Sequence, residues 1–464
     1  MINRRKFLAH SCSLGMASAT LSTTLGSTLL SLGLARGAAA QGAGDYRALV
    51  CILLAGGNDS WNMLVPADTD QHAQYRAIRT DLALPRAELL SLPGATAEGR
   101  RYGLHPGMSG LQALVADGNA ALVCNVGTLL EPFDPVAVAN GSARAPLGLF
   151  SHADQIQQWQ TGIADARVTE GWGGRTADLL QGVNAANGIS MNISLSGNNV
   201  FQSGATVGEY SVEAAGDGAA GINAYDDGTQ FGTYRKQVID SLLTVSQENI
   251  LRREYRSRLV NAIESQQIFA GALQQAPALG TKFSPGYFSQ SLRQIARIIS
   301  VRAQLGATRQ TFFVTVGGWD HHDDVLNQQA EMLPMISSGL LEFRNALNEL
   351  AMLDAVTTFT TSDFGRTLTS NGKGSDHGWG GHHIVMGGSV NSGTYFGTYP
   401  EIKPGNPLDV GRGIYAPTTS VDQYFAELAL WFGVPASDLA SVLPNVARFY
   451  SPASAELPLG FLRL

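Results

Sequence analysis

Short apolar runs alternate with amphipathic segments along most of this chain of 464 residues. The runs are rich in Val, Ile, Phe and Thr, and they fall at residues 46–57, 120–126, 311–316, 355–361 and 383–387. Nearly continuous apolar runs of this length are typical of strands buried on both faces of a parallel sheet. We therefore expect a strand at each of these positions.

Amphipathic segments with helical spacing lie between and after these runs. They cover residues 106–118, 235–275, 287–305, 325–353 and 419–432. Thr419 or Ser420 is a suitable N-cap for the last of them. The order of strand, loop, helix and strand is typical of βαβ units. The sequence thus predicts an α/β fold with helix, sheet and helix layers and a largely parallel central sheet.

The composition changes between residues 182 and 233, where Gly, Asn, Ser and Ala predominate. Short alternating stretches such as Ile189–Gly197 (ISMNISLSG) occur there, and alternation of this kind is typical of strands. We interpret residues 182–233 as a small β-rich cap inserted into one α/β domain over residues 41–464.

The N-terminus has the features of an export signal. Asn3–Leu8 (NRRKFL) is a twin-arginine pattern, a Ser- and Thr-diluted apolar stretch follows, and Ala38–Ala40 is a small-residue cleavage site. An uncleaved membrane anchor is the alternative, because the apolar stretch approaches spanning length. Its many Ser, Thr and Gly residues favour a signal peptide at residues 1–40. We expect export through the twin-arginine machinery to the periplasm or medium, with no membrane attachment after cleavage.

Charge and cysteine usage narrow the function classes. Residues 1–40 hold four basic and no acidic residues, so their removal lowers the formal net charge from −7 to −11. An acidic chain without a basic run is a poor candidate for binding nucleic acid.

Cys51 and Cys124 each lie inside an apolar run, and two separate buried thiols fit this pattern better than a disulfide. The chain has no G-x-S-x-G, P-loop or dinucleotide motif.

Candidate chemistry is concentrated in the last third of the chain. Five of the nine histidines and five aspartates fall in the blocks Gly317–Asp324, Thr360–Thr367 and Gly374–His383. Each block lies next to a predicted strand. Since open α/β sheets form their sites at the carboxyl ends of the strands, the blocks predict a divalent metal site at that edge.

Two candidate ligand groups have alternative explanations. Asp59 follows a strand and two glycines, where it either reaches a metal or, as we would favour from this residue alone, forms an Asx turn. Asp320 and His322 are two residues apart, so both point to one face of an extended segment and form a two-ligand arm. A pair with this spacing also arises by chance.

The remaining candidates are equally open. Asp363 and Arg366 form either a structural ion pair or a site in which Arg366 binds an oxyanion. His377 and His382 belong to the densest donor cluster, which is either a ligand set or a solvated loop. Ser151 precedes a histidine and is either a nucleophile or, more commonly for such a serine, a helix N-cap.

These segments, in this order, resemble an exported family known as domain of unknown function 1501. The likeness rests on Leu54–Asn62, Leu104–Pro106, Gly317–His322, Ser362–Gly378 and Pro417–Tyr424, with Trp431–Gly433 beyond. It covers essentially the whole mature chain. The family looks like a branch of the alkaline phosphatase and sulfatase superfamily. That resemblance implies an alkaline phosphatase-like sheet with a metal site at the carboxyl ends of its strands.

The resemblance also implies roles for individual residues. Asp59 matches the Asp that follows the first strand, and Asp363 matches the Asp of a Ser-Asp-His-Gly motif. Asp320 with His322 resembles an Asp-x-x-x-His arm with shorter spacing. His377 or His382 stands for the final His ligand, and Ser151 takes the position of the nucleophile. Two departures are clear: Phe364 replaces a metal-binding His, and no Cys-x-Pro-x-Arg stands near Ser151.

Two functions follow as hypotheses. The first is an exported metal-dependent hydrolase of phosphate or sulfate esters, with zinc or calcium bound by the Asp and His candidates. Ser151 or a metal-bound water would attack, and Arg366 would bind the oxyanion. The second is a non-catalytic exported binding or assembly protein on the same scaffold, whose partner is a second exported protein of unknown function.

Overall fold

The computed structural model describes residues 46–464 except 97, 185–188, 217, 219–224, 226–227 and 246–248. Contacts divide the chain into units at residues 1–45 and 46–464, and the predicted signal peptide lies outside the described residues. Among the described residues, no helix combines the length and apolar character needed to cross a bilayer.

The centre of the second unit is a mixed sheet in the order β11-β5-β10-β9-β1-β8-β6-β7, with β12 beside β5. Its strands are β1 (Arg47–Leu54), β5 (Ala120–Gly127), β6 (Asn192–Ser194), β7 (Tyr210–Ser211), β8 (Arg309–Val316), β9 (Val356–Ser362), β10 (Gly381–Met386), β11 (Tyr395–Gly397) and β12 (Thr419–Ser420). Within the described part of this main sheet, every strand pairing is parallel except the two made by β10. The predicted, largely parallel sheet is confirmed. A small antiparallel sheet is formed by β2 (Leu64–Pro66), β3 (Leu90–Ser91) and β4 (Tyr102–Leu104).

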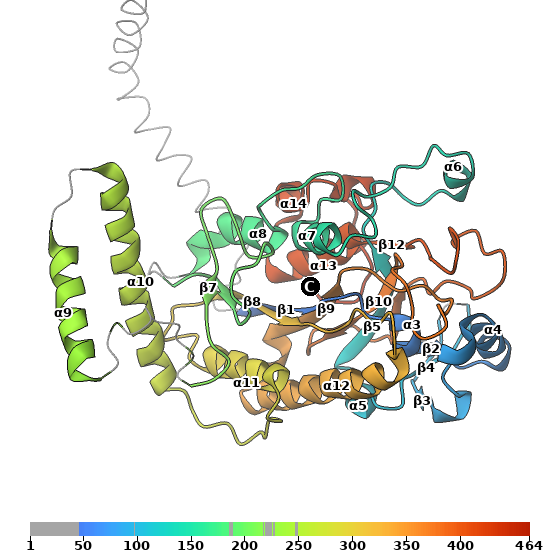
Figure 1. Cartoon of the computed structure of the whole chain (residues 1–464), viewed down its shortest axis with the longest axis horizontal. Coiled ribbons are helices and arrows are strands. Elements are labelled where there is room, and N and C mark those ends of the chain that lie inside the picture. Colours follow the sequence, from blue (N-terminus) through green and yellow to red (C-terminus); the bar gives the residue numbers. More distant parts are fainter. Residues whose placement is uncertain are drawn as a thin grey trace, which may run out of the picture. The chain divides into compact units, whose positions relative to one another are not determined.

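Two layers of helices cover the sheet (Figure 1). One layer contains α5 (Ser109–Ala116), α11 (Tyr287–Ser300) and α12 (Val325–Glu349), and the other contains α7 (His152–Thr161), α8 (Trp172–Leu180), α13 (Val421–Phe432) and α14 (Leu439–Val442). Side chains of β1 alternate between the two cores, since Val50 and Ile52 join one and Leu49 and Leu53 join the other. The three-layer prediction is therefore correct.

The remaining helices are short or lie outside these two layers. They are α3 (Ser60–Met63), α4 (Thr69–Arg79), α6 (Pro135–Ala139), α9 (Gln230–Thr244) and α10 (Ile250–Gln274), with 3-10 turns η1 (Thr80–Leu82), η2 (Arg86–Glu88), η3 (Gln181–Val183), η4 (Leu353–Ala355), η5 (Ala436–Asp438) and η6 (Val446–Arg448). The single helix expected over residues 235–275 is instead two. A new helix begins after Asn249, whose side chain caps α10 by accepting from the backbone N–H groups of Leu251 and Arg252.

Two finer expectations agree with the structure. Ser420 caps α13 through a capping box with Gln423. Cys51 and Cys124 are both free and buried, and they belong to the cores on opposite faces of the sheet, so they cannot bond to each other.

The segment 182–233, interpreted from the sequence as an inserted cap, is described in part. Its described residues add β6 and β7 to the edge of the main sheet, where β6 pairs with β8 in parallel. The polar composition serves this edge, because the side chains of Asn192 and Gln202 both hydrogen-bond to Thr311 of β8. The Asn- and Ser-rich stretch thus extends the sheet.

One edge of the sheet positions the candidate site. The register pairs Leu54, at the end of β1, with Val316 of β8 on one side and with Ser362 of β9 on the other. Three loops therefore leave the sheet side by side. They are residues 55–59, 317–324 and 363–380, which include the first of the three sequence blocks and most of the other two.

Candidate metal centre

Arg366 ties these loops together. Its buried guanidinium donates through Nε to the carbonyl oxygen of Gly57 (2.9 Å) and through Nη1 to that of Ser375 (3.0 Å). Its Nη2 donates to the carbonyl of Gly56 and to the carboxylate of Asp320. Each guanidinium nitrogen thus already has an acceptor, and the carboxylate among these acceptors is that of Asp320 and not that of Asp363, the ion-pair partner considered from the sequence.

His152 lies at the first position of α7, against the end of β9. Its Nδ1 is 2.6 Å from Oδ2 of Asp363, and the other carboxylate oxygen accepts from the backbone N–H of Gly56 at 2.9 Å. Asp363 is buried. A carboxylate acceptor keeps the proton of a neutral imidazole on Nδ1, so Nε2 of His152 carries a lone pair.

His322 and His377 are held in the same tautomer. Nδ1 of His377 donates to the carbonyl oxygen of Phe150 at 2.8 Å, and Nδ1 of His322 is 3.3 Å from Oδ1 of Asp376. Arg366 supports the assignment for His322, because its Nη1, which can only donate, is 3.5 Å from Nε2 of that imidazole.

The three Nε2 atoms converge on Asp320. Its carboxylate oxygens are 3.5 Å from Nε2 of His152, 3.0 Å from that of His322 and 3.5 Å from that of His377. The Nε2 atoms of His322 and His377 are 2.9 Å apart. Lone pairs at such distances repel unless a cation or a proton lies between them. Ligand atoms of His152, Asp320 and His377 all lie within 4.8 Å of one another, a spacing that suits one shared ion.

The protonation states favour a bound cation. Burial acts to raise the pKa of Asp320, but the hydrogen bond and charge of Arg366, with the nearby imidazoles, hold that pKa below its usual value. Burial lowers the pKa of His377. At neutral pH the site therefore presents a carboxylate and a neutral imidazole, which are the forms that bind metals.

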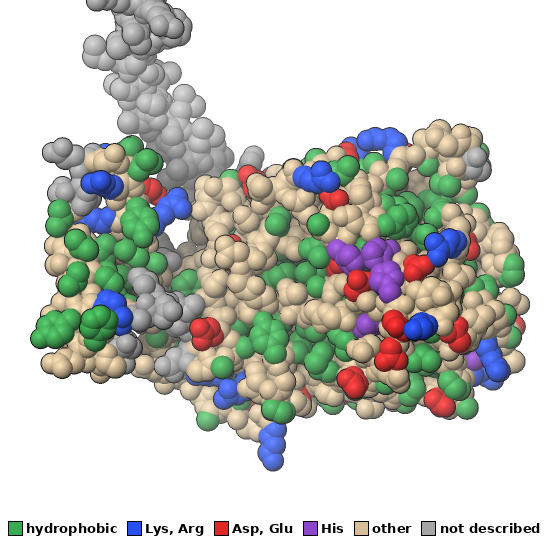
Figure 2. Space-filling model, in the orientation of Figure 1, with side chains coloured by type: hydrophobic (Ala, Val, Ile, Leu, Met, Phe, Trp, Pro, Cys, Tyr) green, Lys and Arg blue, Asp and Glu red, His purple; other side chains and the backbone are tan. Residues whose placement is uncertain are grey.

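Phe364 forms a wall of the site. Its ring lies 4.9 Å from that of His152 and 4.5 Å from that of His377, measured between centroids. A residue noted in the sequence as a missing ligand thus packs against two imidazoles that face the centre. Figure 2 shows histidines gathered on this face beside acidic and basic side chains.

The structure brings together Asp320, His322, Asp363 and His377, in agreement with the expected convergence of the blocks. Asp363 contacts the centre only through His152, so its role there is orientation. Asp59 lies apart from the histidines. Its buried carboxylate accepts from the guanidinium of Arg79 and from the hydroxyl of Ser375 (2.6 Å).

Asp59 and His382, both ligand candidates from the sequence, have contacts outside this centre. Asp59 belongs to an ion pair, and its Oδ1 has no partner among the described residues. The ring of His382 stacks on Tyr399 at 4.4 Å, its Nδ1 accepts from the backbone N–H of Asn125 at 3.1 Å, and burial lowers its pKa to about 3. Neither belongs to the group that could share an ion.

Ser151 has the N-cap role. Its hydroxyl accepts from the backbone N–H of Asp154 at 3.5 Å and so caps α7. The imidazole that follows it, His152, is oriented by Asp363 and not by the serine. Among the described residues, the structure gives Ser151 no contact with a base that would activate it as a nucleophile.

The sequence reasoning missed His152 as a ligand. It considered the Ser151-His152 pair only for the serine, and the histidine stands far from the later blocks along the chain. The available signal was its position directly after a helix N-cap, which places the first side chain of a helix at the edge of a layer.

A groove is lined in part by the loop that follows His377. Trp379, two residues after His377, lines it together with Leu129, Phe133, Arg144 and Val410, and its volume is about 560 Å³. The indole N–H of Trp379 donates to the carbonyl of Thr128 at 2.8 Å, so the ring is fixed. Pockets of this size and apolar character commonly hold small ligands.

Comparison with solved structures gives only loose alignments. The crystal structure of Ps i-CgsB aligns at 11% identity over 89% of this chain and 78% of that chain, with a TM-score of 0.34. The same protein in complex with k-i-k-neocarrahexaose gives 10% identity and 0.33, with the same coverage. The C-terminal periplasmic domain of EcEptC from Escherichia coli, in complex with Zn, gives 10% identity and 0.31, over 90% of this chain and 92% of that chain. Likenesses this loose assign no residue of the site.

A search of curated proteins found no match. A family model does match, over residues 46–437, which span every element that builds the centre described above. The chain belongs to the family described as "Protein of unknown function (DUF1501)".

Proposed function

We propose that this protein is an exported metal-dependent hydrolase of phosphate or sulfate esters. His152, Asp320, His322 and His377 would hold one divalent cation. The convergence of three Nδ1-tethered imidazoles on one carboxylate is the observation that carries the proposal. The ligand atoms of His152, Asp320 and His377 lie within 4.8 Å of one another, and His322 joins them through Asp320 and His377. Three nitrogens and one oxygen favour zinc over calcium, which takes oxygen ligands.

The residues around the cation have separate tasks. When bound, a divalent cation supplies Lewis-acid chemistry, which polarises an ester and makes a bound water more acidic. Asp363 keeps the lone pair of His152 directed inward, and Arg366 keeps Asp320 charged and in place. Phe364 shields two imidazoles from water on one side. The groove at Trp379 would hold the part of the substrate that does not react.

The choice of ester rests on the sequence resemblance. The motifs at Asp59, Asp320 and Asp363 resemble those of the alkaline phosphatase and sulfatase superfamily, whose substrates are phosphate and sulfate esters. Because Asp59 lies in an ion pair with Arg79, we propose one cation in this centre and not two. A metal-bound water is a better nucleophile candidate than Ser151, which caps a helix.

A non-catalytic binding or assembly protein is the second candidate. The observation that favours it is the full engagement of Arg366, which leaves an incoming oxyanion without the expected guanidinium. Under this proposal the metal would hold the loops in place, and a second exported protein would be the partner. Export by the twin-arginine machinery to the periplasm or medium belongs to both proposals.

Metal analysis of the natively exported protein tests both candidates. We expect about one zinc per chain, lost in Asp320→Ala. Turnover of phosphate or sulfate esters by the metal-loaded protein, absent in Asp320→Ala, supports the hydrolase. Metal without turnover across both ester classes supports the binding protein. Protein that is folded but takes up no divalent metal contradicts both.

A further inference from the structure

Helix α9 carries an apolar stripe that faces solvent. Phe231, Tyr234, Val238, Leu242 and Val245 follow one another at intervals of 3, 4, 4 and 3 residues, and each is more than half exposed. Such spacing is that of the seam along which helices pack in coiled coils and bundles. Soluble proteins rarely leave a row of this kind uncovered.

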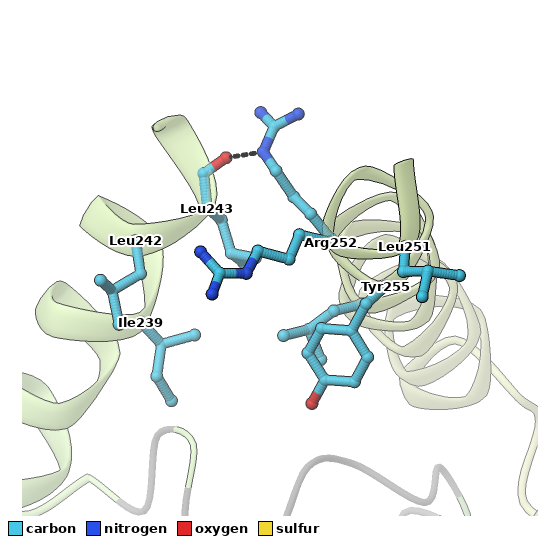
Figure 3. A pocket seen from close by; sticks show the side chains of 8 residues that line it. Ile239, Leu242, Leu243, Leu251, Arg252 and Tyr255 are labelled. Carbon is cyan, nitrogen blue, oxygen red and sulfur yellow. Dashed lines mark hydrogen bonds between the residues drawn. The ribbon is translucent and has the colours of Figure 1, made fainter. Parts of the chain in front are cut away.

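Helix α10 continues this face. Ile250, Leu251 and Tyr255 are 69%, 75% and 70% exposed. The two helices are in contact, since Nε of Arg256 donates to the carbonyl oxygen of Leu243, as Figure 3 shows. Between them lies a groove of about 480 Å³, and its apolar lining is Ile239, Leu242, Leu243, Leu251, Tyr255 and Leu259.

We infer that this hairpin, α9 with the first half of α10, is the interface for a second copy of the chain. It presents both an apolar ridge, Phe231 to Leu242, and an apolar groove. A two-fold pair needs one surface that complements itself, and a ridge beside a groove meets that condition. Two such hairpins packed together form a four-helix bundle.

The exposed area is sufficient for a stable pair. Eight apolar side chains at these exposures present on the order of 100 Å² each, or roughly 800 Å² per copy, which is the size of a standard stable interface. Flanking charges are partly paired within each hairpin. Lys236 contacts Asp240 and Arg258 contacts Glu254, both at 2.8 Å, so these positions bring no uncompensated like charge to the partner. Arg252 and Arg256 also line the groove, so a two-fold pair must place their guanidinium groups at its rim or against acceptors.

Sedimentation of the mature protein across a wide concentration range tests this inference. We expect a dimer, and we expect Leu242→Glu with Leu251→Glu to weaken it by about tenfold or more, because a charge would be buried in an apolar seam. Gln237→Glu is the matched control. Combined with Thr233→Glu, it adds the same two charges at exposed positions of α9 outside the stripe and should remain dimeric.

Circular dichroism shows whether each variant is folded and does not depend on the interface, whereas the thermal midpoint of a dimer changes with association. A wild-type protein that stays monomeric at all concentrations overturns the inference. So does a Leu242/Leu251 variant as dimeric as the control. Monomeric wild-type protein that binds vesicles containing anionic phospholipid through these leucines would assign the face to a membrane surface instead.

Discussion

His377 and His382 are five residues apart, yet their surroundings are opposite. His377 lies in the loop before β10, where Nδ1 is bound to the Phe150 carbonyl and Nε2 faces two other imidazoles and a carboxylate. His382 is within β10, stacked on Tyr399, with burial lowering its pKa to about 3. A dense histidine block thus contains both a proposed metal ligand and a structural residue, and the acceptor at Nδ1 distinguishes them.

Strand geometry explains the difference. Successive side chains of β10 point to opposite faces, so His382 packs against Trp61 in one core and His383 packs against Trp159 in the other. His377 comes before the strand begins and remains at the edge of the sheet. The position relative to the strand end therefore decides which histidine meets the other blocks.

The largest effect is expected when each of the two histidines is replaced in turn. We expect His377→Ala to weaken metal binding by about 100-fold or more, because it removes a direct ligand. We expect His382→Gln to leave metal content unchanged. Metal analysis after dialysis against weak chelator measures both. Equal loss in the two variants would show that the comparison is wrong.

The second test of the difference between the two histidines is the free energy of unfolding at acid pH. In the folded protein the pKa of His382 falls from 6.5 to about 3 through burial, so the unfolded chain binds more protons between these values. The stability contributed by neutral His382 is present above about pH 6.5 and is lost as the pH falls towards 3, by up to about 5 kcal/mol.

Replacing that group should therefore flatten the acid side of the profile. We expect His382→Gln to lose less stability than the wild type between pH 6.5 and 4, measured by denaturant unfolding with chelator present. His383 remains as an internal reference, since burial also lowers its pKa to about 3. Parallel profiles for variant and wild type would contradict the assigned burial of His382.

Changing a residue that only orients a proposed ligand should reduce metal affinity less than removing the ligand. Asp363→Asn should weaken metal binding by about 10- to 100-fold, because the amide no longer fixes the tautomer of His152 as a carboxylate does. The ligands themselves are unchanged, so excess zinc should restore occupancy. A loss that excess zinc does not restore would identify Asp363 as a residue needed for folding.

Asp376→Asn should give the smallest change, a few-fold at most, since Oδ1 of Asp376 is 3.3 Å from Nδ1 of His322 in a partly exposed position. Asp376 also accepts from Asn371 at 3.0 Å and pairs with Arg412, so its removal has a local structural cost. Zinc titration of this variant and of Asp363→Asn compares how much each carboxylate contributes to metal affinity. An Asp376 effect larger than that of Asp363 would reverse the order argued here.

Much of the fold followed from apolar runs, because β1, β5, β8 and β9 are buried on both faces and read as continuous apolar segments. The convergence of the loops after β8 and β9 followed from the parallel sheet. The ion pair of Asp59 could not be foreseen, since its partner Arg79 lies at the end of α4, twenty residues on, with nothing in its local pattern to mark it. His152 was missed for the same reason, because its partners come from distant segments.

The reversed direction of β10 has one further effect. Because β9 ends and β10 begins at the same edge, residues 363–380 leave and return to neighbouring points, and their two stems pair through Gly365, Thr367, Asp376 and Gly378. The tip of this segment, Asn371 to Lys373, is exposed and lies about midway along the chain between β9 and β10. At this tip Asn371 donates to the carbonyl oxygen of His322 and to the carboxylate of Asp376, both at 3.0 Å, so the folded-back segment braces two residues of the candidate centre from its outer end while the paired base holds its inner end.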